Sequence, residues 1–252
     1  MKKRGQITVF VILAIMIIAV GVLIYMFYPQ IKASFGFKVE SPNAFLQNCL
    51  EEDVTNAIET LSLQGGSINP EHYYTYLNNK IEYLCYTNEN YERCVMQQPM
   101  LKEHVESEIK NSIKNKVDEC LDEMKKAFES QGYEIVLRKG DFDVELLPKR
   151  IALSFSSSVS LKKGEEIRNY QSLSFSIKKN IYELISIANS ILNSEAAYGD
   201  AEITTYMNYY PDLKVEKKKQ NDGTTIYILT DKNTQDKFQF ASRSIVWPPG
   251  YF

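Results

Sequence analysis

The sequence predicts an α+β fold: an N-terminal transmembrane helix, then a helical segment, then an antiparallel sheet with added helices. Three observations support this prediction. The run from Ile7 to Tyr28 contains no charged residue. Apolar residues recur at helical spacing over residues 41–131, and the spacing changes to strand-like alternation after Gly132. Charged residues make up 24% of the chain and aromatic residues 12%, which is typical of a globular protein.

The apolar run is long enough to be a membrane anchor. As a helix rising about 1.5 Å per residue it would cover about 33 Å, close to the ~30 Å hydrocarbon core of a bilayer. The cytoplasmic segment 1–6 contains Lys2, Lys3 and Arg4, and the positive-inside tendency places the domain that follows outside the cell. We therefore predict a single-pass protein of the cell membrane that contacts the lipid bilayer through Ile7 to Tyr28, residues 7–28.

A stalk and a first helix are expected after the anchor. Residues 29–40 form the predicted stalk, and residues 41–131 form the helical extracytoplasmic segment. Ser41 suits an N-cap, Pro42 suits the first turn, and the pair Gly65-Gly66 stops the helix. This first helix is predicted from its apolar residues at positions three and four apart.

Two further helices are expected in the same segment. One begins at Pro70 and continues through a tyrosine-rich stretch to Leu84. The other follows Pro99 and ends at Gly132, with apolar residues on one face and charged residues on the opposite face. The charged face is interpreted as a solvated helix surface.

Residues 132–252 form the predicted β-rich extracytoplasmic segment. Strands are expected over residues 133–138, 142–147, 151–161 and 167–177. Turns are expected at Lys139-Gly140 and Lys163-Gly164. The remaining elements are helices over 181–192 and 201–210, a hairpin of 213–219 with 225–230 around Asn221-Asp222-Gly223, and a last strand over 238–245.

The residues Lys3-Arg4-Gly5-Gln6, directly before the apolar run, resemble an archaeal class III signal peptide of the type IV pilin-like kind. The resemblance implies cleavage between Gly5 and Gln6, after which the apolar helix stays on the mature protein and can pack against other helices. Pilin-like proteins usually place a Glu five residues into the mature chain, where this chain has Phe10. The whole chain also resembles uncharacterised, singly anchored surface proteins of small-genome archaea, which share the Arg-Gly-Gln start and a helix ending in Gly-Gly.

The chain has four cysteines: Cys49, Cys85, Cys94 and Cys120. All follow the predicted anchor, and a compartment outside the cell permits disulfides. Of the three pairings that four cysteines allow, we favour Cys85–Cys94, which closes a short loop, and Cys49–Cys120, which ties two helices together. Free buried thiols are the main alternative, because Cys49 and Cys120 lie on apolar helix stripes.

Residues suited to catalysis are scarce. The sequence has no Gly-rich phosphate loop, no Gly-x-Ser-x-Gly motif and no His-Glu-x-x-His motif. It has no Cys-x-x-Cys pair, and His72 and His104 have no ligand-like spacing from the cysteines, so we predict neither metal nor cofactor. Asp141 and Asp143 alternate along a strand and are interpreted as solvated. We therefore predict that the protein is not an enzyme.

Nucleic acid is not an expected partner. The chain carries 29 Lys and Arg against 32 Asp and Glu, and this balance disfavours binding to a polyanion. The basic run Lys217–Lys219 is interpreted as decoration of a strand. Two features could contact proteins: the tyrosines Tyr206, Tyr209 and Tyr210, and the aromatic tail Trp247–Phe252.

Together these features predict a non-enzymatic, membrane-anchored cell-surface or envelope protein, pilin-like, that acts in assembly or binding outside the cell. Its expected partners are further copies of the chain or other envelope proteins. One alternative is a membrane-anchored ligand-binding or sensory domain. A less favoured one is an extracellular hydrolase, which would require His72 or His104 within about 3 Å of a Ser or carboxylate in a cleft.

Overall fold

The computed structural model describes residues 16–18 and 41–246. The chain divides into two compact units, Met1–Val39 and Glu40–Phe252, and the second is α+β. Its elements are α2 (Pro42–Leu63), β1 (Tyr73–Tyr76), β2 (Asn79–Tyr86), β3 (Val95–Met96), α3 (Leu101–Ser130), β4 (Glu134–Arg138), β5 (Phe142–Leu147), β6 (Arg150–Phe155), β7 (Ser158–Lys163), β8 (Glu166–Tyr170), β9 (Leu173–Ile177), α4 (Ile181–Tyr198), α5 (Ile203–Tyr209), β10 (Leu213–Lys219), β11 (Thr224–Asp231) and β12 (Lys237–Arg243).

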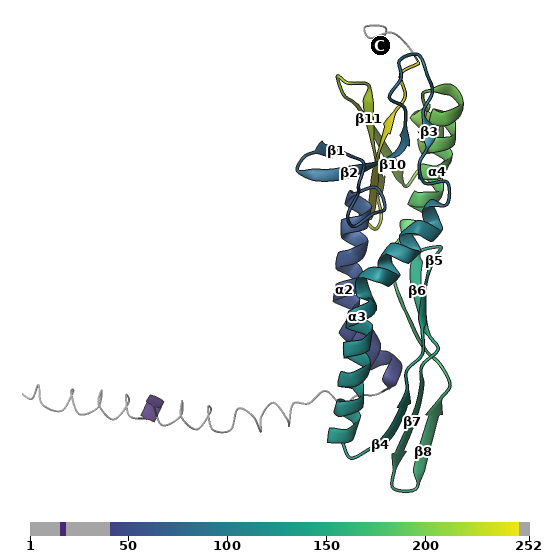
Figure 1. Ribbon diagram of the computed structural model, residues 1–252. Coiled ribbons are helices and arrows are strands. Elements are labelled where there is room, and N and C mark those ends of the chain that lie inside the picture. The colour runs from purple at the N-terminus through teal and green to yellow at the C-terminus, as the bar shows by residue number, and fades with distance from the viewer. Residues whose placement is uncertain (1–15, 19–40, 247–252) are drawn as a thin grey trace, which may run out of the picture. The chain divides into compact units, whose positions relative to one another are not determined.

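Helices α2 and α3 pack against each other along apolar stripes (Figure 1). At the start of α2, Ser41 Oγ accepts a hydrogen bond from the Ala44 N–H at 3.2 Å, as an N-cap should. Leu46, Leu50 and Val54 are among the buried residues of α2, and the stripe of α3 is buried in the same way. The predicted first and third helices are therefore confirmed, with the bounds given above.

A mixed six-stranded sheet forms one end of the unit, in the order β1-β2-β12-β11-β10, and β3 pairs with β2 (Figure 1). Strand β12 runs parallel to β2, with Ala241 opposite Tyr83, whereas the other strand pairs are antiparallel. Helix α4 packs on β11, β12 and β2. Buried aromatic rings lie in this core, and those of Tyr227 and Phe240 stack with centroids 5.1 Å apart.

Two three-stranded sheets, β4-β7-β8 and β5-β6-β9, make up the rest of the β structure. The predicted strands 151–161 and 167–177 each divide where the chain passes from one sheet to the other, because the strands cross there (Figure 1). The crossing is tight: a Cβ on Gly140 would lie 2.7 Å from the carbonyl oxygen of Ser156, and the Gly140 N–H donates to Ser157 Oγ. Lys139-Gly140 lies between β4 and β5, as predicted, but it connects strands of two different sheets, because β4 pairs with β7 and β5 pairs with β6.

The predicted fold class was wrong in two respects. The sheet was expected to be antiparallel, but it is mixed because β12 joins β2 in parallel. In addition, no helix within residues 16–18 and 41–246 is both long and apolar enough to cross a membrane. Of the predicted transmembrane helix Ile7 to Tyr28, all but residues 16–18 lies outside the described residues, as do the predicted stalk 29–40 and the cytoplasmic segment 1–6.

The helix predicted from Pro70 was also wrong, because this stretch forms the β1–β2 hairpin. Leu77 and Asn78 at its turn have φ of 48° and 67°, the left-handed backbone that two-residue hairpin turns require. In β2, the residues Ile81, Tyr83, Leu84 and Cys85 are buried. Tyrosine and threonine in β1 favour a strand, and this preference outweighs the helical spacing of a few apolar residues.

Candidate functional site

The cysteines form two disulfides, Cys49–Cys120 and Cys85–Cys94. These are the pairs that the sequence favoured. The first ties α2 to α3, and the second ties β2 to the loop that leads into β3. The predicted processing site, Gly5 and Gln6, lies outside the described residues.

A buried serine lies between a histidine and a glutamate at the end of α2. Ser67 Oγ is 2.8 Å from His104 Nε2, on the first turn of α3, and it donates a hydrogen bond to Glu82 on β2. The neighbouring Ile68 N–H donates to Glu108 at 2.9 Å. Burial raises the pKa of the Glu82 carboxyl, although the Ser67 hydroxyl works against the rise.

The distance between Ser67 Oγ and His104 Nε2 is as short as a serine hydrolase requires, but the hydrogen-bond directions do not suit a histidine that acts as a base. The hydroxyl proton of Ser67 goes to Glu82, so the bond with His104 requires a proton on Nε2. An imidazole nitrogen that already carries its proton cannot act as a base toward the serine. Ser67 is also only 6% exposed, so the described contacts suit a structural link among α2, β2 and α3.

The other residues considered for catalysis make structural contacts. His72 packs against the rings of Tyr83 and Tyr86, with centroids 4.8 and 4.2 Å away. Asp141 and Asp143 both face Lys110 Nζ, at 3.0 and 3.1 Å. The hydrogen bond from Lys110 lowers the pKa of the exposed Asp141 carboxyl.

The sequence features considered for partners differ in their exposure and contacts. Tyr206 OH contacts Ser190 Oγ at 2.9 Å, whereas Tyr209 is 79% exposed and Tyr210 is also exposed. In the basic run, Lys217 is mostly buried and pairs with Asp200. The tail Trp247–Phe252 lies outside the described residues.

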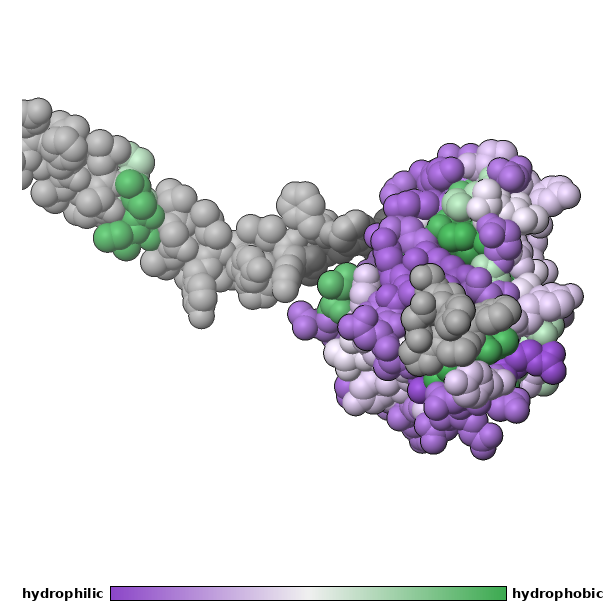
Figure 2. Space-filling model, turned by 90° about the horizontal axis from the view of Figure 1, so that it is seen from above, coloured by the Kyte–Doolittle hydropathy of each residue, from purple (hydrophilic) through white to green (hydrophobic). Residues whose placement is uncertain are grey.

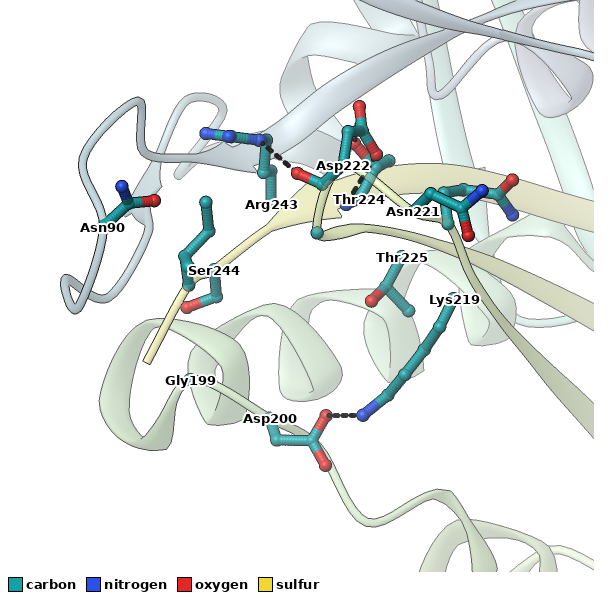
Figure 3. Close-up of a pocket in the computed structure, with 13 residues that line it drawn as sticks. Asn90, Gly199, Asp200, Lys219, Asn221, Asp222, Thr224, Thr225, Arg243 and Ser244 are labelled. Carbon is teal, nitrogen blue, oxygen red and sulfur yellow. Dashed lines mark hydrogen bonds and ion pairs between the residues drawn. The ribbon is translucent and has the colours of Figure 1, made fainter. Parts of the chain in front are cut away.

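The best candidate site is a cavity of about 540 Å³, partly open to solvent, at the β10–β11 turn. It is lined by the turn, residues 219–225, by residues 243–245 at the end of β12, by Gly199 and Asp200 after α4, and by Asn90. Figure 3 shows Arg243 and Asp222 on one side of this space and Asp200 and Lys219 on the other, with Thr225 between them. The volume lies within the range of about 300–1,000 Å³ that small-molecule sites occupy.

The turn that forms one wall follows from the sequence Asn221-Asp222-Gly223. The Asp222 carboxylate accepts hydrogen bonds from both the N–H and the hydroxyl of Thr224, each at 3.0 Å, and Gly223 has φ of 86°. The hairpin was predicted from these residues. The cavity was not, because its walls come from four separate stretches of the chain.

A buried carboxyl lies in the same end of the unit and was missed in the sequence. Glu195 on α4 is 2% exposed and accepts hydrogen bonds from Tyr227 OH and, at 3.2 Å, from Ser242 Oγ. Burial raises the pKa of Glu195, and burial beside this carboxyl raises the pKa of Tyr227 as well. A signal was present, since Glu195 continues the apolar stripe of α4 through Ala188 and Ile191.

Comparisons of the chain with known protein families, curated proteins and solved structures found no match. The geometry and the sequence therefore carry the functional argument alone.

Proposed function

We propose that the chain is a non-enzymatic cell-surface or envelope protein, anchored at the cell membrane, that acts in assembly or binding outside the cell. The observation that carries the proposal is the pair of disulfides, Cys49–Cys120 and Cys85–Cys94. Disulfides form and persist in oxidising compartments and are rare in the cytosol. They are therefore expected in a domain that works outside the cell.

The N-terminal sequence supports the same location. Its basic residues precede an apolar run, and the stretch through Gly5 and Gln6 resembles a pilin-like processing site. The described surface suits a protein that works in water: Figure 2, seen from above, is mainly hydrophilic with small, separate hydrophobic areas. In this proposal the mature protein acts by contact with other molecules and not by catalysis.

The test is mass spectrometry of the full chain extracted from membranes, combined with protease treatment of intact cells. We expect a mature N-terminus at Gln6, four cysteines without free thiols, and digestion of the domain by external protease. A Gly5→Val variant should stay uncut, and Gly21→Val is its matched control. Intact Met1, or a domain protected from external protease, would contradict the proposal.

A second candidate function, extracytoplasmic ligand binding, is favoured by the cavity at the β10–β11 turn. Assembly alone would not require a pocket of this volume. The two functions are compatible, because a surface protein can bind a small ligand through one end of its domain.

A further inference from the structure

A second cavity, of about 560 Å³, lies where three connections of the domain meet. Its lining comes from the turn between β5 and β6, from residues 178–180 between β9 and α4, and from the end of β11 with the turn that follows. It shares no lining residue with the cavity at the β10–β11 turn. Its volume lies within the range of small-molecule sites, about 300–1,000 Å³.

Positive side chains dominate the lining of this second cavity. It contains four cations, Lys149, Arg150, Lys178 and Lys179, against one carboxylate, that of Asp231. The whole chain has the opposite balance, with 29 Lys and Arg against 32 Asp and Glu. The positive charge is therefore a local feature of the cavity and not a consequence of the composition.

Three of these four cations lack an ion pair. Lys179 Nζ lies 3.4 Å from Asp236 and 3.6 Å from Glu59, so Lys179 is already paired. For the charged groups of the other three, all exposed, no carboxylate of residues 41–246 lies at ion-pair distance. Glu183 accepts the backbone N–H of Lys149 at 3.3 Å, and not its ammonium group. These three cations are therefore available to a ligand.

The carboxylate of Asp231 does not balance them. It accepts hydrogen bonds from neutral donors: Asn180 Nδ2 at 2.5 Å and the N–H groups of Asn233 and Thr234 at 2.7 and 3.2 Å. With one carboxylate against three unpaired cations, two positive charges remain in excess in the lining. A group that carries two negative charges would match this excess.

The backbone of Lys149 indicates a use for its side chain. Lys149 has φ of 61° in the two-residue turn between β5 and β6, in the left-handed region where glycine or asparagine is less strained. The turn thus carries an ammonium group at a position where the backbone alone would favour another residue.

We propose that this second cavity binds a phosphate group, either free or as the monoester of a small organic molecule. A phosphate ester carries about −1.5 to −2 charges at pH 7 and three strong acceptor oxygens, which suits the excess of two positive charges. The Arg150 guanidinium can bind two of these oxygens with parallel hydrogen bonds, and Lys149 and Lys178 supply point charges beside it. A carboxylate, with a single negative charge, would leave part of the excess unbalanced.

The test is isothermal titration calorimetry of the full chain, purified in detergent with its disulfides intact, at low ionic strength. The probes are inorganic phosphate, sn-glycerol 3-phosphate and acetate. We expect at least one of the two phosphates to bind about tenfold or more tightly than acetate, because a dianion gains more from three cations than a monoanion does. Added salt should weaken this binding, since exposed charges are screened. Tighter binding of inorganic phosphate would indicate a site for the free ion, and tighter binding of glycerol phosphate a site for an ester.

Two cavity variants and two matched controls locate the binding. Arg150→Gln and Lys178→Gln should each weaken phosphate binding by about fivefold or more, because each removes one positive charge beside the ligand. Arg138→Gln on β4 and Lys126→Gln on α3 remove the same charges outside the cavity and should bind like the original chain. All four positions are exposed, so the variants should fold, which circular dichroism checks.

Three results would overturn the inference: no binding of either phosphate at millimolar concentration, acetate binding as tight as that of the phosphates, or cavity variants that bind like their controls. None of these results affects the mature N-terminus or the protease accessibility of the domain, which test the proposed function separately.

Discussion

His104 Nε2 lies 2.8 Å from Ser67 Oγ, joining the first turn of α3 to the loop that follows α2. The same hydroxyl donates to Glu82 on β2, so one serine connects the loop after α2 with β2 and α3. The histidine and the serine of a hydrolase would have a similar distance. What distinguishes this contact is the direction of the serine proton and the burial of the hydroxyl, and both favour a structural role.

Replacing Ser67 should therefore affect stability. Ser67→Ala leaves the Glu82 carboxyl and the His104 ring without their shared partner, at a cost of about 1–3 kcal/mol. Urea unfolding followed by circular dichroism measures this loss, and Ser130→Ala, at an exposed serine on α3, is the control. Covalent labelling of Ser67 by a fluorophosphonate probe would instead indicate a reactive nucleophile and contradict the structural role.

The buried carboxyl of Glu195 should make the domain less stable as the pH rises. Its pKa is raised above the ordinary value of 4.5, so the folded state holds the proton more strongly than the unfolded state does. Its contribution is thus fully present below pH 4.5 and is lost as the pH rises through the folded-state pKa.

Glu195→Gln should remove this part of the pH dependence, because the amide is neutral throughout and can still accept from Tyr227. The measurement is the free energy of unfolding of both proteins between pH 4 and pH 8. The difference should be largest in the upper part of that range, where the original chain carries the buried charge. Parallel curves for the two proteins would show that Glu195 does not titrate differently on folding.

The two disulfides should stabilise the domain unequally. They join residues separated by 71 positions for Cys49–Cys120 and by 9 for Cys85–Cys94. From the loop-closure entropy of the unfolded chain, the first disulfide should stabilise the domain by about 4 kcal/mol and the second by about 2.5 kcal/mol. Denaturant unfolding of the Cys49→Ser/Cys120→Ser and Cys85→Ser/Cys94→Ser double variants tests the order. A larger loss from the short loop would show that contacts in the folded state outweigh chain entropy.

Gly140 should tolerate no side chain at the crossing between the two small sheets. A Cβ there would lie 2.7 Å from the Ser156 carbonyl oxygen, which is backbone and cannot move aside alone. Gly140→Ala should cost more than about 2 kcal/mol. Gly132→Ala is the matched comparison, because its φ of 81° is strained for alanine but its Cβ would meet nothing within 4 Å, so about 1 kcal/mol is expected. Equal losses of stability in the two variants would mean that the backbone around Gly140 shifts to make room for the added methyl group.

Local patterns predicted much of the fold. The stripes of α2 and α3 are long enough to be unambiguous, and Asn221-Asp222-Gly223 specifies a hairpin turn. The helix predicted from Pro70 was wrong because the few apolar residues of this stretch fit a helix as well as a strand. The strands over 151–161 and 167–177 were placed correctly, but their division into two sheets depends on a crossing that involves Gly140 and Ser156.

Features that depend on distant segments could not be predicted in the same way. The parallel pairing of β2 with β12 brings Tyr83 beside Ala241. The sequence around each of these residues contains no pattern that predicts this pairing. The cavity has the same property, since Thr225, Arg243 and Asn90 meet only in the folded domain. The disulfides were the exception, because four cysteines allow few pairings and their helical or loop positions restrict them further.

Strand β12 lies between β2 and β11, so the largest sheet cannot close until residues 237–243 have left the ribosome. Until then β2 has an open edge on that side, and pairing it requires contacts across most of the chain, which slows folding. In a chain that is exported before it folds, as the proposed function requires, this strand order would keep the largest sheet open until residues 237–243 have crossed the membrane.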